Sequence, residues 1–222
     1  MIATKTKQQQ VYELLRERIV NGVYGPGYRV VIDQLAPELG VSPLPVREAI
    51  RRLEAEGLIV YRPNAGAQVA PADPELYADS MTVLALLEGS ATALAAPLLT
   101  GGDLALLAQR TDEMAEAMAR MDPVAFGTHN RAFHQVIHER CPNPVLVSMV
   151  ADVDWRLDAI RNTVFVQIPY RGAASVAEHR ELIELLAAGA PADRIEAVAR
   201  AHKLRTVESF RDWQREHAAG GP

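Results

Sequence analysis

The stretch LAPELGVSPLPVREAIRRLEAEGLI, residues 35–59, decides the fold of the N-terminal part of this chain. It predicts a short helix over residues 34–39 that begins after Asp33, a good helix-capping residue. Gly40 stops this helix, and a second, longer helix follows from Ser42 to Glu56, with a proline in its first turn. Two short helices around a turn that contains glycine are typical of a helix-turn-helix.

The flanking residues complete the pattern. Residues 8–21 carry apolar side chains at helical spacing and end at Asn-Gly, which predicts an amphipathic helix. A turn then leads to a short strand over 28–32. After the second helix of the motif, strands over 58–61 and 67–70 are joined by RPNAG at 62–66, which predicts a hairpin. The expected unit is therefore a winged helix-turn-helix.

Beyond a linker at Pro71–Pro74, the sequence contains no strand signal of comparable quality. Ala and Leu dominate and aromatic residues make up only 5%, which favours helices. We therefore expect a mainly α chain, with a winged helix-turn-helix domain at 1–71 and an antiparallel α-helical bundle at 72–222. The expected helices of the bundle span 75–99, 103–120, 123–140, 144–167, 175–188 and 192–216.

The charge and the cysteine content limit the class of protein. The net charge of −5 divides into +2 for residues 1–71 and −7 for the rest, and phosphate binding depends on the local surface. The single cysteine, Cys141, cannot form an internal disulfide, which favours a cytoplasmic protein. The chain starts with a polar segment, and the most apolar stretch, 81–100, contains Glu88 and Pro97, so we expect a buried helix there.

Six segments resemble the GntR family of bacterial transcription regulators, and specifically its FadR-type subgroup with the all-helical, metal-binding FCD effector domain. The N-terminal resemblance rests on GVYGPGYRV, on the run at 35–59 and on NAGAQV at 64–69. The C-terminal resemblance rests on HNRAFHQVIHERCPNPVL, AEHRELIELLAAG and ARAHKL. The resemblance extends over almost the entire chain, from about residue 8 to 210, and implies a protein that binds operator DNA.

The resemblance implies that the helix at 42–56 reads the major groove of DNA. Arg47 would fork onto a guanine or clamp a phosphate, and the small wing tip would enter a minor groove. Ion pairs of the helix arginines with neighbouring glutamates are the alternative. Pro43-Leu44 stand where the family commonly has Arg-Thr, so the operator sequence cannot be carried over. The candidate DNA-binding residues are Ser42, Arg47, Arg51, Arg52, Asn64 and Gly66.

The resemblance also implies a divalent metal, Zn, Ni or Mn, that binds a small carboxylate effector directly. The implied ligands are Asn130, His134, His179 and His202. The family usually has Asp at the first of these positions, and it often has Arg where this chain has Leu84. Candidates for an additional effector-binding cation are Arg131, Arg156 and Arg161, whereas His129, His138 and His217 are expected at the surface, although an accidental histidine cluster stays an alternative.

The expected function is that of a homodimeric repressor that binds a pseudo-palindromic operator and responds to an effector. A regulator for which the metal itself is the signal is one alternative. A metalloenzyme built on three histidines is another, but Gln135 follows His134, so the chain lacks the glutamate of a metalloprotease motif. We therefore expect that the chain is not an enzyme.

Overall fold

The computed structural model describes residues 5–20, 22–62, 65–71, 73–167 and 170–218, without the side chains of 158–170 and 217–218. The chain forms two compact units, Met1–Asp73 and Pro74–Pro222. Each unit has its own core of buried side chains.

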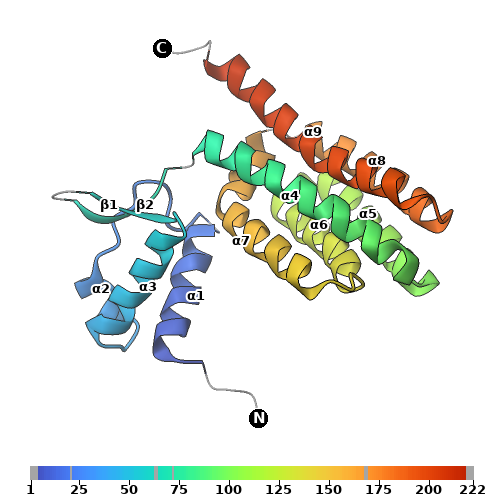
Figure 1. Ribbon diagram of the computed structural model, residues 1–222. Coiled ribbons are helices and arrows are strands. Elements are labelled where there is room, and N and C mark those ends of the chain that lie inside the picture. The colour runs from blue at the N-terminus through green and yellow to red at the C-terminus, as the bar shows by residue number, and fades with distance from the viewer. Residues whose placement is uncertain (1–4, 21, 63–64, 72, 168–169, 219–222) are drawn as a thin grey trace. The chain divides into compact units, whose positions relative to one another are not determined.

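The first unit combines three helices with a two-stranded antiparallel sheet (Figure 1). The fold class expected from the sequence, a winged helix-turn-helix followed by a helical bundle, is confirmed. The strands pair in the register Ile59↔Val69 to Arg62↔Gly66. The elements are α1 (Lys7–Val20), α2 (Ile32–Glu38), α3 (Pro43–Ala55), β1 (Ile59–Arg62) and β2 (Gly66–Val69).

One face of α3 packs into the core of this unit. Val46 and Leu53 of α3 are fully buried, as is Leu15 of α1, and the two helices pack against each other. The turn between α2 and α3 contains Gly40 at φ +62°, a left-handed conformation that favours glycine. These contacts hold α3 firmly while its opposite face stays outside the core.

Two local expectations were wrong. The segment at 28–32 forms only an isolated bridge, between Arg29 and Gln68, because it pairs with β2 alone and gives way to α2 at residue 32. Helix α2 therefore begins earlier than expected, with Val31 rather than Asp33 at the N-cap. The predicted hairpin tip includes residues 63–64, which lie outside the described residues.

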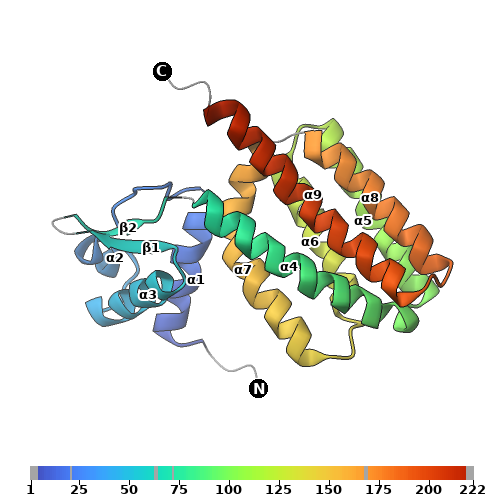
Figure 2. The same ribbon diagram turned by 45° about the horizontal axis from the view of Figure 1, so that its top comes forward.

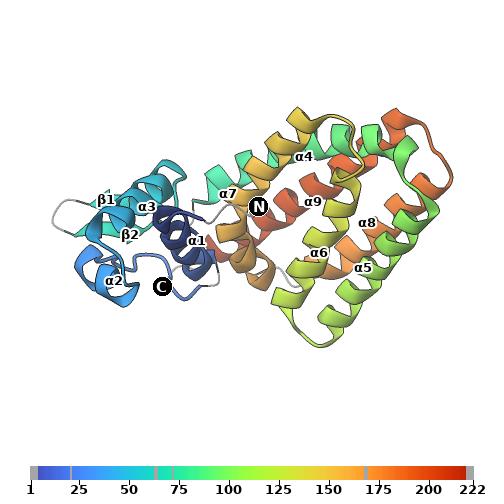
Figure 3. The ribbon, with the colours of Figure 1, turned by 90° about the horizontal axis from the view of Figure 1, so that it is seen from below.

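The second unit is a bundle of helices (Figure 2). Helix α4 packs against both α7 and α9, and α5 packs against both α6 and α8. Figure 3 shows α6 between α5 and α7, and α6 also contacts α4. The helices are α4 (Pro74–Ala95), continued by the 3-10 turn η1 (Ala96–Leu98), α5 (Gly101–Ala119), α6 (Pro123–His138), α7 (Pro144–Gln167), α8 (Tyr170–Ala187) and α9 (Ala192–Ala218).

Helix α4 is the most apolar helix of the bundle, and Pro74–Leu98 would be long and apolar enough to cross a membrane by length and composition alone. Its inner face lies in the core instead, where Tyr77 and Leu84 are fully buried. Gly89 allows α9 to approach closely, because a Cβ atom there would lie 3.0 Å from the carbonyl oxygen of Glu196. Glu88, next to this contact, is buried with it.

Candidate functional site

Helix α3 exposes a face that carries two arginines. Leu44, Arg47 and Arg51 are exposed at helical spacing, on the side away from the buried Val46 and Leu53. Among the residues that the structure describes, neither Arg47 nor Arg51 forms a hydrogen bond or an ion pair. This face therefore presents two free guanidinium groups to solvent.

Arg52 lies on a different side of α3 and is held by contacts within the unit. Its guanidinium carbon lies 3.7 Å from the ring centroid of Tyr12 on α1. Its Nη1 donates to Gln9 Oε1 at 2.9 Å, and its Nε donates to Glu56 Oε1 at 3.2 Å. The alternative expected for the helix arginines, an ion pair with a neighbouring glutamate, therefore holds for Arg52, which also joins α1 to α3.

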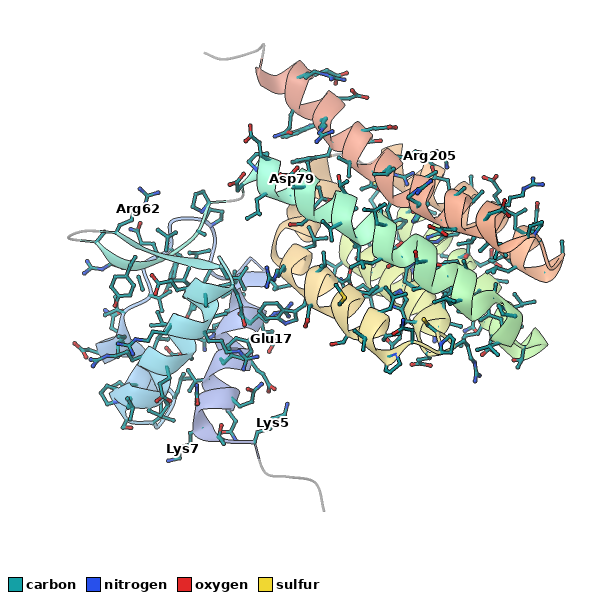
Figure 4. All side chains as sticks on the ribbon, in the orientation of Figure 1. Lys5, Lys7, Glu17, Arg62, Asp79 and Arg205 are labelled. Atoms are coloured by element: carbon teal, nitrogen blue, oxygen red, sulfur yellow. The ribbon has the colours of Figure 1, made fainter. Side chains whose placement is uncertain are left out.

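The other candidates on this unit lie at the start of α3 and on the wing. Ser42 occupies the N-cap position of α3, is exposed and makes no side-chain capping bond. Gly66 begins β2 at φ +75°, and Asn64 lies outside the described residues. Arg62 at the end of β1 is exposed and projects from the wing (Figure 4), so the wing carries a cation that was not among the predicted DNA-binding residues.

Three histidines from three helices of the second unit meet in its interior. They are His134 of α6, His179 of α8 and His202 of α9, all buried, and their candidate ligand atoms lie within 4.8 Å of one another. The Nε2 atoms of His179 and His202 are 3.2 Å apart. Asn130 is also buried, on α6 one turn before His134.

Burial lowers the pKa of all three imidazoles. For His179 and His202 burial is the largest cause, neighbouring histidines add to it, and the pKa falls well below its ordinary value. For His134 burial also lowers the pKa, although Glu88 opposes the shift. Neutral imidazoles are the form that binds metal ions.

Two of the imidazoles are held by carboxylates, the buried Glu88 and the largely buried Glu178. Nδ1 of His134 lies 3.2 Å from Glu88 Oε2, and Nδ1 of His202 lies 2.6 Å from Glu178 Oε2. The third ring, His179, is stacked on Phe133 with 3.9 Å between the ring centroids. Carboxylates at the second nitrogen of a histidine are the usual support for a metal ligand.

Each carboxylate has a buried cation beside it. Lys203 Nζ lies 3.2 Å from Glu88 Oε1, and Arg171 Nη1 donates to Glu178 Oε1 at 3.0 Å. Burial opposes ionisation of Glu88, but His134, Lys203 and His138 together hold its pKa well below the ordinary value. Glu88 is therefore a buried carboxylate that stays charged.

None of these four supporting residues was predicted as part of the site from the sequence. Arg171 was missed because the expected helix began at residue 175, whereas α8 begins at Tyr170. Glu88 had a visible signal, since it is the sole charged residue between Asp79 and Asp103. Glu178 and Lys203 are direct chain neighbours of the two histidines His179 and His202, but spacing alone does not distinguish them from surface charges.

Other expected positions differ from the structure. His138 was expected at the surface, but it is half-buried on α6, where its Nε2 lies 3.1 Å from Glu88 Oε2. His129 is also half-buried and pairs with Glu113, with Nδ1 2.8 Å from Oε2. The side chain of His217 is outside the described residues.

The described part of the structure does not bring the predicted effector-binding residues together. Arg131 is half-buried on α6 and Arg156 is exposed on α7, whereas the side chain of Arg161 is outside the described residues. Among the described side chains, the buried cations of this unit are Arg171 and Lys203, and each of them already pairs with a carboxylate, Glu178 or Glu88.

The donor set fits a divalent metal ion. Nε2 of His134 is buried and has no hydrogen-bond partner, which is costly for a polar atom unless something else binds it. Two further Nε2 atoms approach each other at 3.2 Å, on His179 and His202. Three neutral imidazoles suit Zn, Ni or Mn, with Asn130 on α6 as a possible oxygen donor.

Comparison with known proteins agrees with this architecture. Residues 7–69 match the family "Bacterial regulatory proteins, gntR family", and residues 79–206 match the FCD domain family. A transcriptional regulator from an unstable DNA locus of Streptomyces ambofaciens is 29% identical over 83% of this chain and 77% of its own length. The regulator McbR of Escherichia coli is 29% identical over 81% of this chain and 80% of its own.

Solved structures agree on the fold. The structure of Escherichia coli McbR/YncC aligns with a TM-score of 0.73 at 24% identity, covering 96% of this chain and all of the other. At that identity the likeness shows the fold alone, whereas the family models cover the two units separately. The chain thus belongs to the GntR family of bacterial regulatory proteins, with an N-terminal winged helix-turn-helix and a C-terminal FCD domain.

Proposed function

We propose that this DNA-binding transcription regulator is a cytoplasmic repressor that responds to a small carboxylate through a metal ion in its FCD domain. The observation that carries the proposal is the meeting of His134, His179 and His202 inside the bundle. The family membership makes the chain a regulator, and the relatives named above are regulators too. The role of the cluster would then be to sense a ligand rather than to catalyse a reaction.

The metal would be held by the three imidazoles, with Asn130 as a fourth ligand. An Asn oxygen is neutral, so the ion keeps more of its positive charge than it would beside Asp. When bound, the ion supplies a Lewis acid with open positions for a carboxylate. Lys203 and Arg171 balance the carboxylates Glu88 and Glu178, so these pairs leave the charge of the ion uncompensated.

For the DNA, we propose that α3 reads the major groove with its exposed face. Arg47 and Arg51 are free to reach bases or phosphates, and Ser42 lies at the helix N-terminus, where backbone amides attract phosphate. The wing at Asn64 and Gly66 would contact the neighbouring groove. Arg52 is assigned a structural role, because its guanidinium already has three partners.

We further propose that the chain is a homodimer and that its operator is a pseudo-palindrome. Helix α4 exposes Val83, Leu86 and Leu94, and the adjacent α7 exposes Val145 and Met149. No residue of α4 after Asp79 places a charge on this surface, because Glu88 is buried. The uncharged apolar face of α4 suits an identical one on a second copy, whereas α7 also exposes the charged residues Asp152 and Arg156.

The metal part of the proposal is tested by thermal unfolding of the full chain after treatment with a chelator. Zn²⁺, Ni²⁺ and Mn²⁺ are added separately, and binding to the folded state raises the melting temperature. The wild type is compared with His134→Ala and with His129→Ala, a matched control on the same helix whose partner is Glu113. We expect a rise for wild type and for His129→Ala, and none for His134→Ala.

The effector part uses the metal-loaded chain and a series of mono-, di- and hydroxy-carboxylates. A ligand of the metal raises the melting temperature further, and chelation abolishes that increment. Stabilisation that survives both chelation and His134→Ala would refute the metal mechanism. If metal alone changes DNA affinity and no carboxylate adds to it, the ion itself is the signal.

A further inference from the structure

Glu88 joins three helices of the bundle through one buried carboxylate. It belongs to α4, and its side chain is 2% exposed. Oε2 faces Nδ1 of His134 at 3.2 Å and Nε2 of His138 at 3.1 Å, both on α6, and Oε1 faces Nζ of Lys203 on α9 at 3.2 Å. The contacts with Lys203 and His138 are charge contacts rather than hydrogen bonds, and a carboxylate at this depth depends on such partners to stay charged.

The contact with His134 determines which of its nitrogens is available to a ligand. A neutral imidazole carries a single proton, and the nitrogen that bears it cannot coordinate a metal. A carboxylate accepts hydrogen bonds and donates none, so the nitrogen facing Glu88 must be the one that carries the proton. Nε2 of His134, which is buried without a hydrogen-bond partner, is then left with its lone pair.

We propose that Glu88 is a positioning residue for the metal centre, which holds the His134 ring with its proton on Nδ1 and its Nε2 lone pair toward the other two imidazoles. Lys203 keeps the Glu88 carboxylate charged and in place. This inference rests on the metal site proposed above, but the proton position on His134 is a property of the metal-free chain as well.

The same arrangement recurs at a second histidine, with different residues. Glu178 lies 2.6 Å from Nδ1 of His202, Arg171 pairs with Glu178, and Nε2 of His202 again faces the cluster. His179 has no carboxylate at Nδ1 and is oriented by its stacking on Phe133. In both cases a carboxylate contacts Nδ1 of the ring, and a buried cation pairs with that carboxylate. This repetition supports the same role for the two contacts.

The test must separate the contact between Nδ1 of His134 and the Glu88 carboxylate from the loss of a buried charge. Two double variants do so, because each removes both Lys203 and the charge of Glu88: Lys203→Met with Glu88→Gln, and Lys203→Met with Glu88→Leu. The glutamine oxygen still accepts from Nδ1, whereas leucine offers no acceptor. The affinity for Zn²⁺ is measured by competition with a fluorescent chelator, after circular dichroism confirms that each variant is helical.

We expect Zn²⁺ to bind the leucine variant about 10- to 100-fold more weakly than the glutamine variant, which is the usual effect of losing a hydrogen-bond partner behind a metal ligand. Equal affinities would overturn the proposal. Glu113→Gln, which removes the carboxylate paired with His129, provides a control and should leave Zn²⁺ affinity unchanged.

The position of the proton is read directly by long-range ¹H–¹⁵N NMR of the metal-free wild type at neutral pH. We expect the His134 proton on Nδ1, and a shift of population toward Nε2 in the leucine variant. A proton on Nε2 in the wild type would overturn the proposal even if no variant folds. If wild type binds no Zn²⁺ while its proton lies on Nδ1, the metal site fails and the positioning by Glu88 stands.

Discussion

Replacing Arg47 with alanine is expected to weaken DNA binding without weakening the fold. The side chain is exposed on α3 and has no partner among the described residues, so its loss should change the free energy of unfolding by less than about 0.5 kcal/mol. A guanidinium that forks onto a guanine contributes about 1–3 kcal/mol to base discrimination. The dissociation constant should therefore rise about 5- to 150-fold per half-site.

Arg52→Ala is the matched comparison, because it removes the same group from the same helix but from a different side. The stacking on Tyr12 contributes about 0.5–1 kcal/mol at an exposed site, and the hydrogen bond to Gln9 adds about 0.5–1.5 kcal/mol. The partly exposed ion pair with Glu56 adds at most about 1 kcal/mol. We expect Arg52→Ala to lower the free energy of unfolding by about 1–3 kcal/mol.

The two variants are distinguished by fluorescence anisotropy on a duplex from the region upstream of the gene, at several salt concentrations. Loss of one phosphate contact lowers the slope of log K against log salt by about 1, whereas loss of a base contact lowers affinity at constant slope. Urea unfolding of the full chain gives the stability. If Arg52→Ala impairs DNA binding as much as Arg47→Ala and leaves stability unchanged, the division of α3 into two sides is refuted.

Three further changes test the bundle. Gly89→Ala should destabilise the bundle against urea, because crowding of the Glu196 carbonyl costs about 1–3 kcal/mol. This cost outweighs the gain of about 1 kcal/mol in helix propensity. Gly101→Ala is the control, because a Cβ atom there meets open space, and it should not destabilise the bundle. Hydrogen bonds from Arg140 and Thr100 lower the pKa of Asp103 to about 2, so its contribution to stability is present above the unfolded pKa near 4 and is lost as pH falls toward 2. Asp103→Asn should flatten that limb of an acid unfolding curve. Leu86→Glu should yield monomers in sedimentation at concentrations where wild type dimerises, and an unchanged dimer would exclude this surface.

Sequence patterns predicted the elements of the first unit because local rules determine most of them. Gly40 and Gly57 end helices, and the apolar face of α3 follows from its spacing. The segment at 28–32 was assigned as a strand because valine and isoleucine favour sheet. That preference could not show that the segment has a single short partner, β2, and is followed at once by a helix.

The candidate metal site was predicted by resemblance, and its supporting groups were not. His134 and Asn130 share a helix face, which spacing reveals, but the meeting of α6, α8 and α9 depends on the packing of the whole bundle. Glu178 precedes His179 along α8, yet its carboxylate contacts the ring of His202 on another helix. Contacts between helices of this kind leave no periodic trace in a single sequence.

The cost of the buried charges argues that the cluster serves a function rather than the fold. Buried Glu88, Lys203 and Arg171 and the largely buried Glu178 lie within the bundle, and taking an ion out of water costs several kcal/mol, which pairing repays only when its geometry is good. Apolar side chains of similar size at such positions are often as stabilising or more so. A core selected for stability alone has no need of Glu88 on a helix whose every other residue from Ser80 to Ala95 is uncharged. The charges are understandable if they hold His134 and His202 with the proton on Nδ1, since an apolar ring such as Phe133 can orient an imidazole by stacking but cannot accept a hydrogen bond from it.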